Sequence, residues 1–130
     1  MDLPRILVTE DEEHTRKQIV DHFTKRINCS MLEAKDAYEA EKHIKEGSID
    51  LILTDIKMPG KSGVEVIIQV REISKDLPII VLSRLDDPQV EEKLKSLNVE
   101  IIPKPFPTKI VFEKSIEKLK ACNKYFPKEI

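Results

Sequence analysis

The sequence predicts an α/β domain in which five parallel strands alternate with five helices. Short runs of β-branched and other apolar residues, typical of strands buried on both faces, recur along the chain. Each run is followed by a stretch with helical periodicity, and this alternation places helices on both faces of a parallel sheet with right-handed crossovers. The 130 residues contain no linker, repeat or low-complexity segment. We therefore expect a single domain over residues 1–130.

The expected strands are apolar runs that end where polar residues begin. They cover Arg5–Thr9, Ser30–Ala34, Leu51–Thr54, Pro78–Ser83 and Ile101–Ile102, and the second, the weakest of them, is typical of an edge strand. The expected helices run from about Glu12 to Arg26, from Asp36 to Glu46, from Gly63 to Ser74, from Asp87 to about Leu97, and from near Thr108 onward. Asp36 is suited to cap the second helix and Asp87, followed by a proline, the fourth. Gly47 and Asn98 are suited to the left-handed positions that close these helices.

Composition narrows the classes of function. The formal charge is −2 and the pI is near 6.0, which argues against direct nucleic-acid binding because that usually requires a basic face. No apolar run approaches membrane-spanning length, and the N-terminus lacks the regions of a signal peptide. Cys29 and Cys122 have no metal-site spacing and fit buried or half-buried thiols in a reducing cytosol better than a disulfide framework. We expect a soluble cytoplasmic protein with no membrane contact.

Polar side chains stand where four of the expected strands end. Glu10 and Asp11 follow the first strand, Asp55 the third and Lys104 the fifth, and Ser83 ends the fourth. Because the carboxyl ends of parallel strands lie along one rim of the sheet, these residues should be neighbours, and that rim is where ligands bind in open α/β sheets. Taken alone, Asp55 is a nucleophile, a metal ligand or a cap on the following loop.

The charges at this rim favour a particular chemistry. Three carboxylates within a few ångströms repel one another, at a cost of about 4 kcal/mol per pair at 4 Å and an effective dielectric near 20. A divalent cation relieves this repulsion, and hard carboxylate oxygens suit Mg²⁺. With Lys104 as a fixed cation and Ser83 as a hydroxyl, the site is suited to receive a phosphoryl group on Asp55.

Four motifs in this order and spacing, ILVTEDE, DLILTDIKMPGKSG, PIIVLS and KPF, make the chain resemble the receiver domains of bacterial two-component response regulators, from Arg5 to about Lys120. The resemblance implies a flavodoxin-like, doubly wound (βα)5 fold with strand order 2-1-3-4-5. It also implies that Asp55 is the phosphoacceptor, Ser83 the switch hydroxyl and Lys104 the phosphate-pairing ammonium. The implied Mg²⁺ ligands are Glu10, Asp11, Asp55 and the backbone carbonyl of Lys57. The Lys104–Pro105 bond is usually cis in such domains.

The resemblance implies a signalling module rather than an enzyme. It would take a phosphoryl group from a histidine kinase or phosphotransfer protein and switch a surface made by the fourth helix, the fifth strand and the fifth helix. Because no effector domain is expected in this chain, an unknown downstream protein would bind that surface. Several positions depart from the family pattern, among them Arg84, which replaces a small residue, and Ile101, which replaces an aromatic one.

Two other functions compete with this interpretation. The departures at Arg84 and Ile101 motivate a pseudo-receiver, a protein-protein interaction module that is not phosphorylated. A phosphohydrolase with an aspartyl intermediate would commonly carry a second acid two residues after its nucleophile, where this chain has Lys57. The intact acids, Ser83 and Lys104 favour the phosphoacceptor.

Overall fold

The computed structural model describes residues 2–84 and 86–129, and its elements follow the expected order. The strands are β1 (Arg5–Thr9), β2 (Ser30–Ala34), β3 (Leu51–Thr54), β4 (Ile79–Leu82) and β5 (Glu100–Ile102). The helices are α1 (Glu13–Arg26), α2 (Ala37–Glu46), α3 (Gly63–Ile73), α4 (Pro88–Ser96) and α5 (Thr108–Ala121). Each expected element is therefore present, with its ends moved by at most a residue or two.

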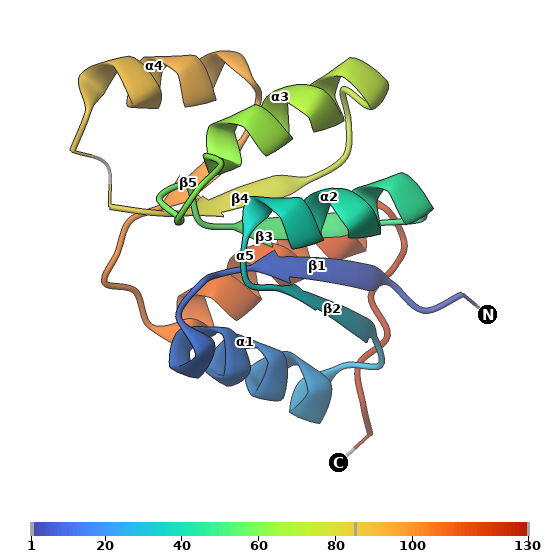
Figure 1. Cartoon of the computed structure of the whole chain (residues 1–130). Coiled ribbons are helices and arrows are strands. Elements are labelled where there is room, and N and C mark those ends of the chain that lie inside the picture. Colours follow the sequence, from blue (N-terminus) through green and yellow to red (C-terminus); the bar gives the residue numbers. More distant parts are fainter. Residues whose placement is uncertain (1, 85, 130) are drawn as a thin grey trace.

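The strands form one parallel sheet in the order β2-β1-β3-β4-β5 (Figure 1). This order confirms the predicted doubly wound fold. The register places Thr9 of β1 beside Ala34 and Thr54, the last residues of β2 and β3. The three strands thus end level with one another, and whatever follows them begins at the same rim.

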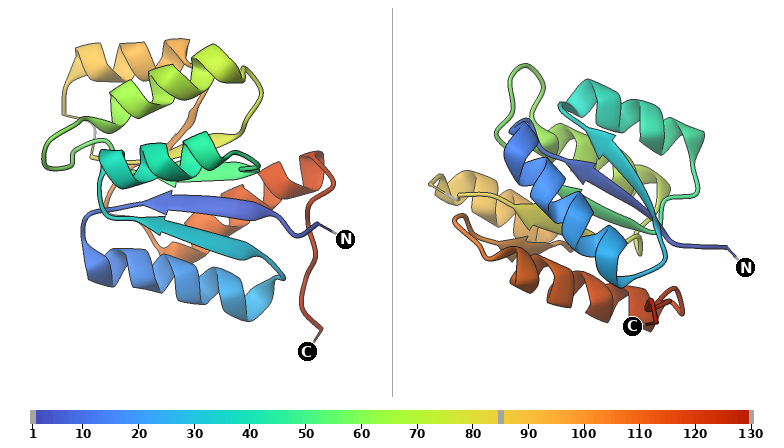
Figure 2. Two further views of the ribbon diagram at one scale, coloured as in Figure 1. Left: turned by 45° about the vertical axis from the view of Figure 1, so that its right-hand side comes forward. Right: turned by 90° about the horizontal axis from the view of Figure 1, so that it is seen from below.

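Helices cover both faces of the sheet, α1 and α5 on one and α2, α3 and α4 on the other (Figures 1 and 2). Side chains alternate between the two faces, as the pleat requires. In β3, Leu51 and Leu53 pack with Phe23 of α1, whereas Ile52 packs with Ile67 of α3. Both faces are fully covered, which explains why the central strands are apolar without alternation.

The predicted helix ends are confirmed. The carboxylate of Asp36 accepts a hydrogen bond from the Glu39 amide at 2.9 Å, and the carboxylate of Asp87 accepts one from the Gln89 amide at 2.9 Å. Asn98 has φ 55° and Gly47 has φ 82°, which are left-handed values. These boundary signals lie within one turn of the helix ends and can therefore be recognised in the sequence alone.

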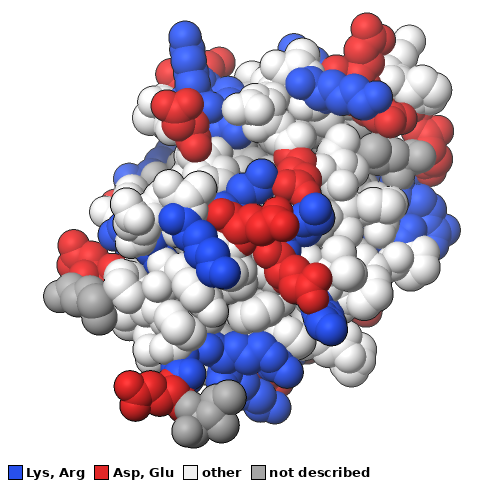
Figure 3. Space-filling model, turned by 180° about the vertical axis from the view of Figure 1, so that it is seen from behind, with Lys and Arg blue, Asp and Glu red and all other residues white. Residues whose placement is uncertain are grey.

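The outer surface carries charges of both signs. Figure 3 shows acidic and basic side chains side by side on the face that carries α5, without one dominant basic patch. Glu100 of β5 pairs with Lys118 at 2.9 Å and with Lys114 at 3.6 Å. Among the described residues, no helix has the length and apolar character needed to cross a bilayer.

Candidate functional site

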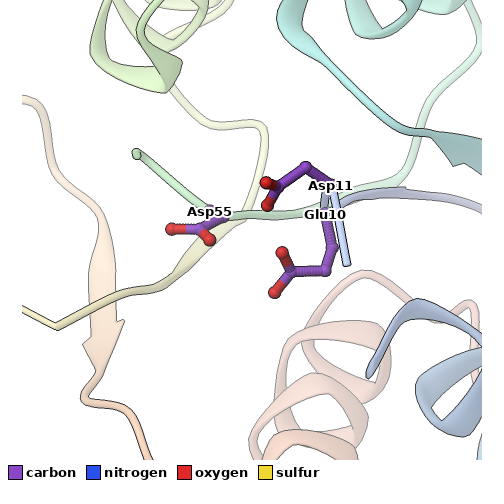
Figure 4. A group of neighbouring side chains, drawn as sticks. All are labelled: Glu10, Asp11 and Asp55. Atoms are coloured by element: carbon purple, nitrogen blue, oxygen red, sulfur yellow. The ribbon is translucent and has the colours of Figure 1, made fainter. Parts of the chain in front are cut away.

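The site lies at the rim where β1 and β3 end. The Asp55 amide donates to the Thr9 carbonyl at 2.9 Å, and the Glu10 amide donates to the Ala34 carbonyl at 3.0 Å. These bonds continue the ladder one residue beyond the strands and bring Glu10, Asp11 and Asp55 together. Figure 4 shows their carboxylates converging, and oxygens from all three lie within 4.8 Å of one another. Glu10 and Asp55 are buried, whereas Asp11 is exposed.

The Asp55 carboxylate is held in a fixed orientation. Its Oδ1 accepts hydrogen bonds from the amides of Ile56 at 2.6 Å and Lys57 at 3.3 Å. Its Oδ2 accepts from the Lys104 ammonium at 2.7 Å. One oxygen is thus held by the backbone of its own loop, and the other is paired with a cation from β5's loop.

Lys104 joins the two buried acids. Its ammonium lies 2.7 Å from Glu10 Oε1 and 2.7 Å from Asp55 Oδ2. Burial disfavours the charged ammonium, but the hydrogen bonds and charges of Asp55 and Glu10 outweigh burial and raise the pKa of Lys104. Its amide donates to the Ser83 carbonyl at 3.3 Å, and the Lys104–Pro105 bond is cis, as the resemblance implies. The predicted neighbourhood of residues 49 and 94 positions apart is therefore observed.

Burial and the neighbouring acids shift the pKa of the Glu10 carboxyl. Its pKa is raised to about 7 from 4.5, first by burial, and further by a hydrogen bond with Asp11 and the negative charge of Asp55. The Lys104 ammonium and the Glu12 amide act in the opposite direction. Near neutral pH and without a cation, this acid therefore retains a proton for a substantial fraction of the time.

The donor set fits a hard divalent cation. Three carboxylate groups meet, and one of them, on Asp11, is open to solvent, so a bound ion would keep several waters. Mg²⁺ binds proteins in this way, through few carboxylates and several waters. The contacts of Lys57 involve its amide and its side chain, and the role of its carbonyl as a ligand stays a prediction.

Ser83 is buried next to this group. Its hydroxyl donates to the carbonyl of Arg84 at a long 3.5 Å, so it is held weakly. Ser83 and Arg84 line a cleft of about 620 Å³ between the loops that follow β3 and β4. Arg84 is exposed. Across these loops Lys57 Nζ donates to both carboxylate oxygens of Asp86 at 2.5 Å.

Gly63 packs closely against the backbone of Asp55 and Ile56, a role that the sequence did not reveal. A Cβ at this position would lie 2.3 Å from the Asp55 carbonyl oxygen and 3.0 Å from Ile56 Cα. The Gly63 amide also donates to the Ile56 carbonyl at 3.0 Å. The start of α3 can therefore approach the phosphoacceptor candidate only without a side chain. The motif KSG contains the residue, but only the tertiary contact explains it.

Comparison with known proteins agrees with this geometry. Residues 6–115 match the family described as response regulator receiver domain. The chain belongs to this family. Response regulator RR06 of Streptococcus pneumoniae is 34% identical over 102 residues, which is 78% of this chain and 46% of RR06. The regulatory protein ResD of Bacillus subtilis is 40% identical over 79 residues, which is 61% of this chain and 32% of ResD. The chain thus spans about half or less of the length of these relatives.

Solved structures show the same receiver fold. The chemotaxis response regulator CheY4 of Vibrio cholerae superposes with a TM-score of 0.80 at 21% identity, over 91% of this chain and all of that one. The response regulator TrrA of Thermotoga maritima, solved in complex with Mg²⁺ and BeF, has a TM-score of 0.78 at 29% identity, over 90% of this chain and all of TrrA. The sequence-based assignment to receiver domains is confirmed.

Proposed function

We propose that this receiver domain accepts a phosphoryl group on Asp55, with Mg²⁺, from a histidine kinase or phosphotransfer protein. One observation carries the proposal: Lys104 Nζ lies 2.7 Å from Asp55 Oδ2 at the rim where three carboxylates converge. A carboxylate with a fixed cation at one side and a cation-binding acid cluster at the other has the parts that phosphoryl transfer needs.

In the proposed step, a carboxylate oxygen of Asp55 attacks phosphorus, and the bond from phosphorus to the donor imidazole nitrogen breaks. The other ring nitrogen of the phosphorylated donor carries a proton, so the donor leaves as neutral imidazole when the phosphorus–nitrogen bond breaks. The Lys104 ammonium already pairs with Asp55 Oδ2, so it is close enough to pair with the oxygens of the transferred phosphoryl group and stabilise their charge. Mg²⁺, held by Asp11, Asp55, the Lys57 carbonyl and, through water, Glu10, would neutralise charge on the transferring group.

The conformational change that follows phosphorylation would be transmitted through β4 and β5. The Ser83 amide donates to the Ile102 carbonyl at 3.2 Å, and the Lys104 amide donates to the Ser83 carbonyl at 3.3 Å. These bonds link the main chain of Ser83 and of Lys104 to the end of β5. A shift of Ser83 toward a phosphoryl oxygen would therefore move the α4-β5-α5 face even though Ile101 is not aromatic. We propose that an unknown downstream protein binds that face.

Incubation with Mg²⁺ and acetyl phosphate tests the proposal. We expect intact-mass spectrometry to show one added phosphoryl group and peptide mapping to place it on Asp55. The matched control is Asp55→Asn, which keeps the size of the side chain and should take none. The same reaction with EDTA should give little product. An unmodified wild-type chain would refute the proposal.

The second candidate is the unphosphorylated interaction module. Arg84 favours it, because a long cationic side chain stands beside the cleft where family members carry a small one. Its signature would be Mg²⁺ binding without an adduct. If Arg84→Ala then became labelled, the arginine would be identified as the block.

A further inference from the structure

We infer that Arg16 is a positioning residue for the divalent-cation site, although it supplies no ligand to it. This inference rests on the metal-binding part of the proposed function. Arg16 lies in the first turns of α1, and its side chain is only 13% exposed. Its Nη1 donates to the backbone carbonyl of Glu10 at 2.8 Å, and its Nε donates to Glu33 Oε1 at 3.0 Å. The guanidinium therefore connects the acidic loop to β2.

The contact with the Glu10 carbonyl controls the placement of Asp11. A peptide unit is planar, so the carbonyl of Glu10 and the amide and Cα of Asp11 move as one body. The Glu10 amide is already fixed by the Ala34 carbonyl at 3.0 Å. With Arg16 holding the oxygen of the next peptide, both sides of Glu10 are fixed. The position of the Asp11 Cα, from which its exposed carboxylate extends, is then fixed as well.

Glu33 makes this anchor rigid. Its carboxylate accepts hydrogen bonds from Arg16 and from Lys17, whose Nζ lies 3.2 Å away. Its backbone carbonyl lies 3.1 Å from His43 Nε2 on α2. The guanidinium fork thus connects Glu10, in the loop after β1, with Glu33 of β2, a geometry that a single ammonium cannot reproduce.

Removing Arg16 has opposite consequences for charge and for position. By charge alone, losing a cation beside an acid cluster makes the site more negative and tightens Mg²⁺ binding. By position, losing the hydrogen bond from Arg16 frees the Glu10–Asp11 peptide. Metal binding must then order this peptide again, and the entropy cost weakens Mg²⁺ binding. The sign of the change in affinity therefore separates the two effects.

The experiment compares Arg16→Met with Lys17→Met. Both variants remove one cation from Glu33, but only the first loses the bond to the Glu10 carbonyl. We expect Arg16→Met to bind Mg²⁺ about tenfold more weakly by calorimetric titration. Lys17→Met should stay within about twofold of wild type. In ¹⁵N NMR spectra of the metal-free proteins, the Asp11 amide should broaden or shift in the first variant only.

Two results would overturn the inference: wild-type or tighter Mg²⁺ affinity in Arg16→Met, or equal weakening in both variants. If Arg16→Met does not fold, Arg16→Lys provides the comparison, because it keeps the charge but not the fork. Weaker binding by Arg16→Lys supports the inference, and wild-type affinity refutes it. A wild-type chain that binds no Mg²⁺ would refute the metal part of the proposed function together with this inference, whereas wild-type binding with an unaffected Arg16→Met refutes only the inference.

Discussion

Glu10 should make the stability of the folded chain depend on pH, and a single substitution can measure this effect. The pKa of this acid is raised to about 7 in the folded chain from 4.5, mainly by burial. Below pH 4.5 both the folded and the unfolded chain hold the proton. As the pH rises toward 7, the unfolded chain loses its proton first, so the folded state loses stability until the pH passes 7. The full difference corresponds to about 3 kcal/mol.

Glu10→Gln removes this titration while keeping the shape of the protonated acid. Relative to wild type, the free energy of unfolding of the variant should rise by about 2–3 kcal/mol between pH 5 and pH 8 in EDTA. Urea unfolding followed by circular dichroism at several pH values measures it. Glu13→Gln is the matched control, because it makes the same charge change at an exposed position of the same loop-helix junction.

Added Mg²⁺ completes the test. In the proposed function the cation binds the ionised cluster of the folded chain, so Mg²⁺ should stabilise wild type more at pH 8 than at pH 6. Glu10→Gln should gain less at pH 8. The reasoning is refuted if the unfolding free energies of wild type and Glu10→Gln stay parallel from pH 5 to pH 8, because burial would then have no effect on this acid.

Three further substitutions test other contacts. Lys104→Met should lower the free energy of unfolding of the metal-free chain by about 3–5 kcal/mol at pH 8. The loss should be smaller at pH 6, where one of the partner acids of Lys104 takes up a proton. Urea unfolding at both pH values measures the difference. Gly63→Ala should cost about 1–3 kcal/mol and reduce acetyl phosphate labelling of Asp55, because the new methyl group meets the backbone, and an unchanged unfolding midpoint would contradict the close approach. Arg71 donates to four carbonyls near the ends of α3 and α4. Arg71→Met should therefore lower the free energy of unfolding by about 2–4 kcal/mol. Lys75 is exposed, and the control Lys75→Met should change the free energy of unfolding by less than about 0.5 kcal/mol.

The sequence predicted the rim of the site because the rule that creates it is topological. Once the strands are parallel, the residues that follow them meet, whatever lies between them in the chain. Asp55 and Lys104 could therefore be paired without knowledge of a single side-chain contact. The helix ends at Asp36 and Asp87 were equally accessible, because capping depends on residues within one turn.

The supporting contacts were not predictable in this way. Arg16 and Glu33 are ordinary charged residues on a helix and an edge strand, and nothing local indicates that one holds the carbonyl of Glu10. The ion pair of Lys57 with Asp86 also joins two loops, and its geometry depends on how the loops fold over the cleft. Such contacts depend on three-dimensional distances that hydrophobic periodicity and capping signals do not contain.

The charge balance of the rim links stability to the proposed function. With all groups ionised, Glu10, Asp11 and Asp55 contribute three negative charges and Lys104 one positive charge, so the site has a net charge of −2 that one divalent cation neutralises. Without the cation, the raised pKa of Glu10 lets a proton replace part of that charge. Under the proposed function, metal and proton would compete for the same acids near neutral pH, and Mg²⁺ binding should release a proton. The acid that we expect to lower the stability of the metal-free fold would thus be the same group that makes the fold responsive to the metal.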